Sequence, residues 1–123
     1  MEKVLIVDDN RASRDLIRAI LKTVRCEIIE AKNGREALAL MQQARPHLVL
    51  LDIDMPDLDG LMAVKRIRED RSLADLPVVA VTAFAMERDR ENGMAAGFTA
   101  YLTKPVRAAI LRQQVQQLLG AQA

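Results

Sequence analysis

The chain has 123 residues, half of them hydrophobic, and a formal net charge of +1. This length suits one domain with a single core, and the nearly balanced charge excludes a general attraction to nucleic acid or to an anionic membrane. The N-terminal apolar run is too short for a signal peptide, and no stretch reaches the ~18 apolar residues that cross a bilayer, so we expect a cytoplasmic protein that binds neither nucleic acid nor membrane. The one cysteine, Cys26, excludes an intrachain disulfide and is expected to be partly buried near the start of a strand.

Apolar runs and helical patterns alternate along the chain. Short β-branched runs predict buried strands, and apolar residues three or four positions apart predict helices between them. In chain order the pattern predicts a strand over 3–7, a helix over 11–25, a strand over 26–31, a helix over 35–44, a strand over 47–51, a helix over 60–70, a strand over 78–82, a helix over 84–96, a strand over 99–102 and a helix over 105–119. Pro105 is expected in the first turn of the last helix.

Five repeats of strand and helix imply a parallel sheet with helices on both faces. The runs at 3–7, 47–51 and 78–82 are almost continuously apolar, which is typical of central strands buried on both faces. We find no linker, so one α/β domain is expected to fill the chain.

The carboxyl ends of four predicted strands carry polar or charged residues: Asp8, Asp9, Asp52, Thr82 and Lys104. Ligands of open α/β sheets bind at this edge. Three neighbouring carboxylates repel one another, and a bound cation would relieve the repulsion. Because the set contains no His or Cys, its oxygen ligands suit Mg²⁺. Together with a hydroxyl and a lysine, these groups suggest phosphoryl transfer.

Four motifs extend this pattern: VDDN at 7–10, DIDMPDLDG at 52–60, VTAFAM at 81–86 and YLTKP at 101–105. In this order and spacing the chain resembles response-regulator receiver domains, the CheY-like family of two-component signalling, from end to end. It looks most like single-domain regulators of the DivK type and receivers attached to hybrid kinases. The resemblance implies a flavodoxin-like (βα)5 fold with strand order 2-1-3-4-5 and one receiver domain over residues 1–123.

The resemblance also assigns roles to the acids. Asp52 matches the aspartate that accepts the phosphoryl group and becomes an acyl phosphate. Asp8 and Asp9 match the acids that bind Mg²⁺ together with Asp52, and the residue at Asp54 would add its backbone carbonyl.

Two further acids are expected to serve structure only. Asp57 is interpreted as a solvated loop residue, and Asp59 before a glycine is placed to cap the next helix. The resemblance also implies that the side chains of Asp54 and Phe84 line the path of the water that hydrolyses the acyl phosphate.

The remaining matched residues form a switch. Thr82 would bond a phosphoryl oxygen and move on activation, and the backbone N–H of Ala83 would face the same oxygen. Tyr101 matches the aromatic residue that swings inward after the threonine shifts, although an edge-strand tyrosine could also simply lie on the surface. Lys104 would contact the phosphoryl group, and its bond to Pro105 is cis in the family.

Two features point to no chemistry. His47 precedes its strand, so it lies at the wrong end of the sheet for the site. A basic stripe on the predicted first helix is either a solvated face or a surface that steers an acidic partner; it comprises Arg11, Arg14, Arg18, Lys22 and Arg25.

The function implied by the resemblance is a phosphorylation-gated signalling switch rather than a turnover enzyme. A histidine kinase or histidine phosphotransferase would donate the phosphoryl group to Asp52 in the presence of Mg²⁺. The phosphorylated domain, a monomer or weak dimer, would then bind a target protein through the face of the fourth helix, fifth strand and fifth helix.

Two alternatives remain at this point. A receiver-like scaffold would fold in the same way but never be phosphorylated, against which the intact acids, Thr82 and Lys104 argue. A haloacid-dehalogenase-type phosphatase would use Asp54 as a general acid and base. That family places its Asp-x-Asp on the first strand, whereas here the motif follows the third.

Overall fold

Five strands form one sheet in which every hydrogen-bonded pair runs parallel. The computed structural model describes residues 1–120 and places the strands in the order β2-β1-β3-β4-β5. Their bounds are β1 Lys3–Val7, β2 Glu27–Ala31, β3 Leu48–Leu51, β4 Val78–Thr82 and β5 Ala100–Thr103. The predicted flavodoxin-like order, with β1, β3 and β4 inside the sheet, is therefore confirmed.

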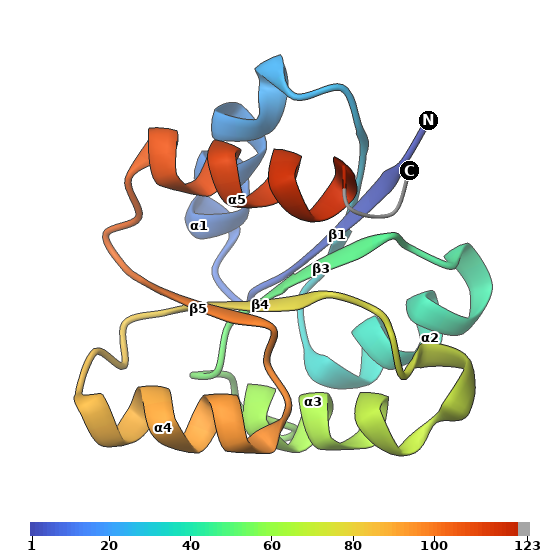
Figure 1. Ribbon diagram of the computed structural model, residues 1–123, viewed down its shortest axis with the longest axis vertical. Helices are drawn as coiled ribbons and strands as arrows, with labels where there is room; N and C mark the ends of the chain where they lie inside the picture. Colours follow the sequence, from blue (N-terminus) through green and yellow to red (C-terminus); the bar gives the residue numbers. More distant parts are fainter. Residues whose placement is uncertain (121–123) are drawn as a thin grey trace.

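Helices cover both faces of this sheet, as predicted (Figure 1). α1 and α5 lie on one face, and α2, α3 and α4 lie on the other. The helices are α1 Arg11–Ile20, α2 Gly34–Ala44, α3 Gly60–Glu69, α4 Glu87–Ala96 and α5 Ala108–Gly120, with short 3-10 helices η1 Leu21–Thr23 and η2 Arg71–Leu73. Within residues 1–120 no helix is long and apolar enough to cross a membrane.

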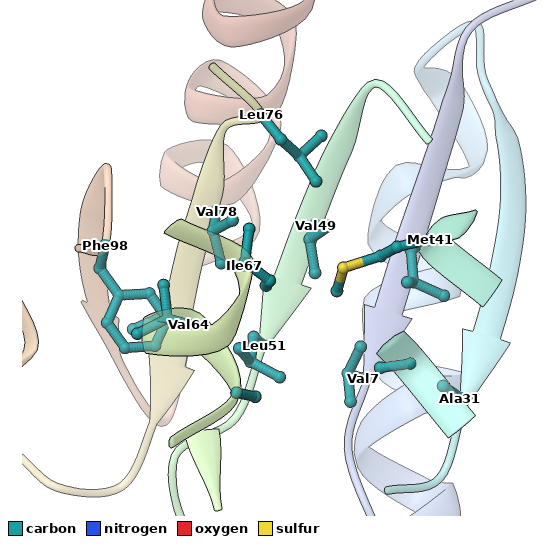
Figure 2. Close-up of a cluster of buried hydrophobic side chains, with 14 of the residues drawn as sticks. Val7, Ala31, Met41, Val49, Leu51, Val64, Ile67, Leu76, Val78 and Phe98 are labelled. Carbon is teal, nitrogen blue, oxygen red and sulfur yellow. The ribbon is translucent and has the colours of Figure 1, made fainter. Parts of the chain in front are cut away.

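Alternate residues of the central strands point to opposite faces and form two cores. Val4 and Ile6 of β1 pack with side chains of α1 and α5, whereas Leu5 and Val7 pack with side chains of α2 and α3. Figure 2 shows part of the second core, in which strand residues meet helix side chains such as Met41. Burial on both faces explains the uninterrupted apolar runs of these strands. The same packing fixes their carboxyl ends at one edge of the sheet.

The first helix is shorter than the predicted span of 11–25. It ends at Ile20, η1 follows, and Val24 is extended with φ −92° and ψ 133°. Thr23 and Val24 are β-branched and therefore favour extended backbone over a further helical turn. Leu16 of this helix is 54% exposed.

Two later helices each begin three residues after their predicted start, α4 at Glu87 and α5 at Ala108. Pro105 therefore precedes the last helix, and the prediction that it lies in the first turn is wrong. It follows a cis peptide bond to Lys104, as the resemblance implied. Before α4, the N–H and the carbonyl of Phe84 form contacts with side chains of β4 and β5, which replace the helical hydrogen bonds expected there.

Arg68 of α3 joins three segments at the end of the sheet opposite these loops. Its Nε donates to the carbonyl of Gly97 at 2.8 Å, and its Nη1 donates to the carbonyl of Leu76 at 2.7 Å. We expect Arg68→Met to lower the free energy of unfolding by about 2 kcal/mol, because both carbonyls lose a charged donor. Urea denaturation beside Arg66→Met, which removes an exposed arginine of the same helix, measures the effect. An equal loss in both variants would show that the carbonyl contacts contribute nothing.

Candidate functional site

The acids selected from the sequence meet Lys104 in one pocket at the carboxyl edge of the sheet. Val7 of β1 is in register with Leu51 of β3, so the residues that follow these strands, Asp8 and Asp52, lie side by side. The pocket is lined by both of these acids and by Asp9, Asn10, Ser13, Asp54, Met55, Pro56, Ala83 and Lys104. Of the five strand-end residues predicted to converge, Asp8, Asp9, Asp52 and Lys104 line this pocket, whereas Thr82 is not among its lining residues.

Lys104 links the two buried acids of the pocket. Its Nζ donates to Oδ2 of Asp8 at 2.8 Å and to Oδ2 of Asp52 at 3.1 Å. Asp8 is 1% exposed and Asp52 is 5% exposed, whereas the lysine side chain keeps a quarter of its surface in solvent. The ammonium group therefore compensates two carboxylates that water barely reaches.

Backbone groups hold the other oxygen of each acid. Oδ1 of Asp8 accepts a hydrogen bond from the N–H of Asn10 at 2.9 Å, and Oδ1 of Asp52 accepts one from the N–H of Asp54 at 3.1 Å. Both carboxylates are thus fixed before any ligand arrives, which favours reactions that depend on positioning. Asp9, the third acid, is exposed at the rim.

The charges in the pocket shift one another's proton affinities. Burial raises the pKa of Asp52 above its ordinary value, although the hydrogen bond and charge of Lys104 oppose the shift. Burial alone would lower the pKa of Lys104, but its hydrogen bonds to Asp8 and Asp52, together with the charges of these acids, outweigh burial and raise it. Lys104 is therefore a cation at neutral pH, as a contact for a phosphoryl oxygen requires.

In the loop after β3, Asp57 and Asp59 of the motif at 52–60 have structural roles that differ from each other. Asp59 caps α3 by accepting a hydrogen bond from the N–H of Met62 at 2.9 Å, as predicted. Asp57 is exposed, as predicted, and also forms an ion pair with Arg35 at 2.9 Å, which the sequence did not indicate. A Cβ on Gly60 would lie 2.5 Å from the carbonyl oxygen of Asp52, so the glycine allows α3 to begin directly against the site.

The expected switch residues form a connected path away from the acids. Thr82 is fully buried, and its Oγ1 accepts a hydrogen bond from the N–H of Phe84 at 3.3 Å. The hydroxyl of Tyr101 donates to the carbonyl of Phe84 at 2.7 Å, and only 3% of this tyrosine is exposed. The alternative of a surface tyrosine is therefore wrong, because the ring lies inward in this structure.

Phe84 lies beside the acid pocket rather than among its lining residues. Its side chain is 39% exposed and borders a neighbouring hollow formed with Ile53, Leu61 and Asn92. Asp54 lines both hollows. That both side chains line the path of the attacking water stays a prediction.

Three residues of the site were missed from the sequence. Asn10 caps α1 and supports Asp8, and Ser13 lies 3.4 Å from Nζ of Lys104. Nη1 of Arg14 donates to the carbonyl of Asp8 at 2.7 Å. The preference of asparagine for helix N-caps could have identified Asn10, whereas nothing in the spacing marks the other two.

Of the features that pointed to no chemistry, His47 and Cys26 lie away from the acids, whereas the basic stripe reaches the site through Arg14. His47 accepts a hydrogen bond from the N–H of Lys3 at the amino end of the sheet, as its place before β3 predicted. In the basic stripe, Arg14 and Arg18 lie 3.1 and 3.6 Å from carboxylate oxygens of Glu30. Part of the stripe is therefore neutralised within the molecule. Cys26 is partly buried just before β2, as predicted.

Comparison with known proteins defines the class of this molecule. The family model of the response regulator receiver domain matches residues 4–116, and the chain belongs to this family of two-component signalling domains. It is 38% identical over 119 residues to the polar-differentiation response regulator DivK of Brucella anthropi, covering 97% of each chain. In structure it is similar to the receiver domain of Francisella response regulator 1452, with 27% identity, a TM-score of 0.92 and full coverage of both chains. It is also similar to the Mn²⁺-bound form of response regulator Rcp1, with 30% identity, a TM-score of 0.80 and coverage of 96% and 91%.

Receiver domains bind Mg²⁺ at an acidic pocket, and the donor set present here fits such an ion. Carboxylate oxygens of Asp8, Asp9 and Asp52 lie within 4.8 Å of one another. The cluster contains neither His nor Cys, and one of its three acids faces solvent. A hard cation that keeps several waters suits this arrangement, because it needs one or two carboxylates and an open side. The participation of the Asp54 carbonyl stays a prediction.

Proposed function

We propose that the protein is a phosphorylation-gated switch whose Asp52 accepts a phosphoryl group from a phosphohistidine. One observation carries the proposal: Nζ of Lys104 bridges Oδ2 of Asp8 and Oδ2 of Asp52 at 2.8 and 3.1 Å in an open pocket. A fixed carboxylate oxygen, a cation and further acids around one point support the role of Asp52 as nucleophile. Receiver domains in general receive the phosphoryl group from histidine kinases and act on downstream proteins, and we propose the same for residues 1–123.

The side chains of the pocket divide the transfer among them. A carboxylate oxygen of Asp52 attacks phosphorus, the new O–P bond forms, and the P–N bond to the donor imidazole breaks. The ammonium group of Lys104 moves from the carboxylate of Asp52 toward a phosphoryl oxygen. It can reach this oxygen because it already contacts the carboxylate to which the phosphoryl group is attached. Thr82 turns its hydroxyl, and Ala83 its backbone N–H, toward the same group.

Mg²⁺ would be held by Asp8, Asp9, Asp52 and the Asp54 carbonyl, and would neutralise charge that develops on the phosphoryl oxygens. The Mn²⁺-bound form of Rcp1 supports a divalent cation in this fold. The chain contributes preorganisation: two of the acids are buried and oriented by backbone N–H groups.

Output is proposed to pass to the face formed by α4, β5 and α5. Tyr101 of β5 contacts the loop that contains Ala83 and Phe84, so a movement of Thr82 reaches this face through two hydrogen bonds. We propose that a cytoplasmic target protein binds there and that the domain acts as a monomer or weak dimer, without contact to nucleic acid or membrane.

Intact-mass spectrometry after incubation with acetyl phosphate and MgCl₂ tests the proposal. We expect a gain of one phosphoryl group that decays slowly and that EDTA prevents. A phosphorylation-independent scaffold would gain no mass. A phosphatase of the haloacid-dehalogenase type would instead consume many equivalents of the donor.

Asp54→Asn is expected to speed labelling by acetyl phosphate. The exposed carboxylate stands at the pocket mouth and repels an anionic donor, so its removal should raise the initial rate by about two- to fivefold at low salt. The gain should shrink in 0.5 M NaCl, which screens exposed charges to about 4 Å. Phe84→Ala serves as the comparison, because that side chain lies outside the pocket. An equal acceleration in Phe84→Ala, or a gain that is insensitive to salt, would contradict the electrostatic explanation.

A further inference from the structure

The ring of Tyr101 lies against a helix position that has no side chain. A Cβ on Gly93 of α4 would lie 2.8 Å from Cε2 and 2.9 Å from Cδ2 of the tyrosine. Real Cβ atoms essentially never come so close to another atom, so the ring occupies space that any other residue at this position would fill. The absence of a side chain at Gly93 thus creates a slot between α4 and β5.

The slot is connected to the phosphorylation site by direct contacts. At the far end of the ring, the hydroxyl of Tyr101 donates to the carbonyl of Phe84 at 2.7 Å. The N–H of Phe84 in turn donates to Oγ1 of Thr82 at 3.3 Å. A ring that leaves the slot therefore gives up the hydrogen bond that joins β5 to the carbonyl of Phe84, the residue whose N–H contacts Thr82.

α4 is held mainly at its C-terminal end, close to Gly93, and a hydrogen bond from Nη1 of Arg90 to the carbonyl of Tyr101 at 3.5 Å also joins it to β5. Gly93 is its one buried residue, and seven consecutive residues at its N-terminal end are polar, charged or glycine. The end of the helix is anchored by the hydrogen bond from Arg68 to the carbonyl of Gly97 at 2.8 Å. The ring of Phe98 packs edge-on against Tyr101 from the same end, with ring centroids 6.5 Å apart. Because that end is fixed, crowding in the slot acts on the tyrosine ring more than on the helix.

We propose that Gly93 is the positioning residue of the switch. Its slot holds the ring of Tyr101 inward and so keeps the path from Thr82 to the α4–β5–α5 face connected. An alanine at position 93 closes the slot, turns the ring to the surface and releases the carbonyl of Phe84. The regulatory part of this inference rests on the proposed function, whereas the position of the ring does not.

Tyrosine fluorescence tests the slot directly, because the chain contains one tyrosine and no tryptophan. In Gly93→Ala we expect a severalfold rise in the acrylamide quenching constant of Tyr101, which is 3% exposed in the wild type. Gly120→Ala is the matched control, since its added Cβ meets nothing within 4 Å. A folded Gly93→Ala protein with wild-type quenching would overturn the proposal.

A thermal-melt cycle separates the slot from general damage to α4. Gly93→Ala should lower the melting temperature of the wild type and raise that of Tyr101→Ala, because alanine favours helix once the ring is gone. If Gly93→Ala lowered the melting temperature of the wild type and of Tyr101→Ala by the same amount, the proposed slot would be wrong. Such a result would mean that the added methyl group disturbs something other than the tyrosine.

The regulatory part needs the phosphorylated protein. With acetyl phosphate and MgCl₂, Gly93→Ala should gain one phosphoryl group as the wild type does, but its tyrosine should remain accessible to acrylamide, whereas the ring of the wild type stays shielded. A phosphorylated variant whose tyrosine is as shielded as that of the wild type would overturn the coupling. Failure of the wild type to gain mass would instead count against the proposed function, while the quenching contrast between Gly93→Ala and Gly120→Ala would still decide whether the slot exists.

Discussion

Asp52→Asn is expected to reduce phosphoryl uptake from acetyl phosphate and MgCl₂ to background, because the amide that replaces the carboxylate is a far weaker nucleophile. The structure adds a second expectation. Burial raises the pKa of Asp52, so folding disfavours its ionised form relative to the unfolded chain. In EDTA at pH 7 the variant should therefore be at least as stable as the wild type. Because the pKa of Asp52 is higher in the folded protein than in the unfolded chain, its carboxyl group favours folding at low pH. This contribution is lost as the pH rises through the folded-state pKa, so the wild type gains nothing from it at pH 7.

Asp57→Asn is the matched control for this experiment. It changes the same group five residues away, on an exposed loop residue paired with Arg35. Intact mass should show normal labelling of this variant and none of Asp52→Asn. Labelling of Asp52→Asn at the wild-type rate would make the assignment wrong, and Asp54 would then be the next candidate, because it lines the same pocket.

The parts of the fold that could be predicted are those that produce a pattern in consecutive residues, such as an apolar run. β1, β3 and β4 are buried on both faces, so each appears as an apolar run whose last residue marks the sheet edge. The ends of these strands and of the fifth strand predicted that Asp8, Asp52 and Lys104 meet if the strands are neighbours, and all three line the same pocket. The order of the strands, in contrast, followed only from the resemblance, since alternation alone does not define which strands are neighbours.

The parts that could not be predicted depend on pairs far apart in the chain. The sequence of α4 alone does not indicate why residue 93 is glycine. The reason is the ring of Tyr101, which fills the space beside it. The late start of α4 also depends on Tyr101, whose hydroxyl donates to the carbonyl of Phe84, while the N–H of Phe84 donates to Thr82. Local propensity favoured helix at these residues, and tertiary contacts overrode it.

The largest effect on stability is expected from Lys104→Met. Lys104 is the cation in contact with both Asp8 and Asp52, which are 1% and 5% exposed. Methionine keeps the length of the side chain but leaves two buried carboxylates without compensation. In EDTA at pH 7 we expect the free energy of unfolding to fall by about 2–3 kcal/mol. The lower part of the usual range applies because a quarter of the lysine side chain is exposed.

The pH dependence distinguishes lost charge compensation from lost packing. Without the lysine, the influence that lowers the pKa of Asp52 is gone, and its pKa rises further above the ordinary value. A carboxyl with a raised folded-state pKa binds its proton more readily in the folded protein, so acidification stabilises the variant relative to the wild type. The deficit of Lys104→Met should therefore shrink as the pH falls from 7 toward 4, and MgCl₂ at pH 7 should also reduce it by supplying positive charge.

Urea denaturation at several pH values, with EDTA or MgCl₂, measures these differences. Lys65→Met, which removes an exposed lysine of α3, should lose little stability and show neither dependence. A deficit of Lys104→Met that is constant with pH and unaffected by Mg²⁺ would indicate that the lysine contributes through packing alone. In that case the crowded acids would not require a cation, and the electrostatic basis for both the metal and the phosphoryl contact would be lost.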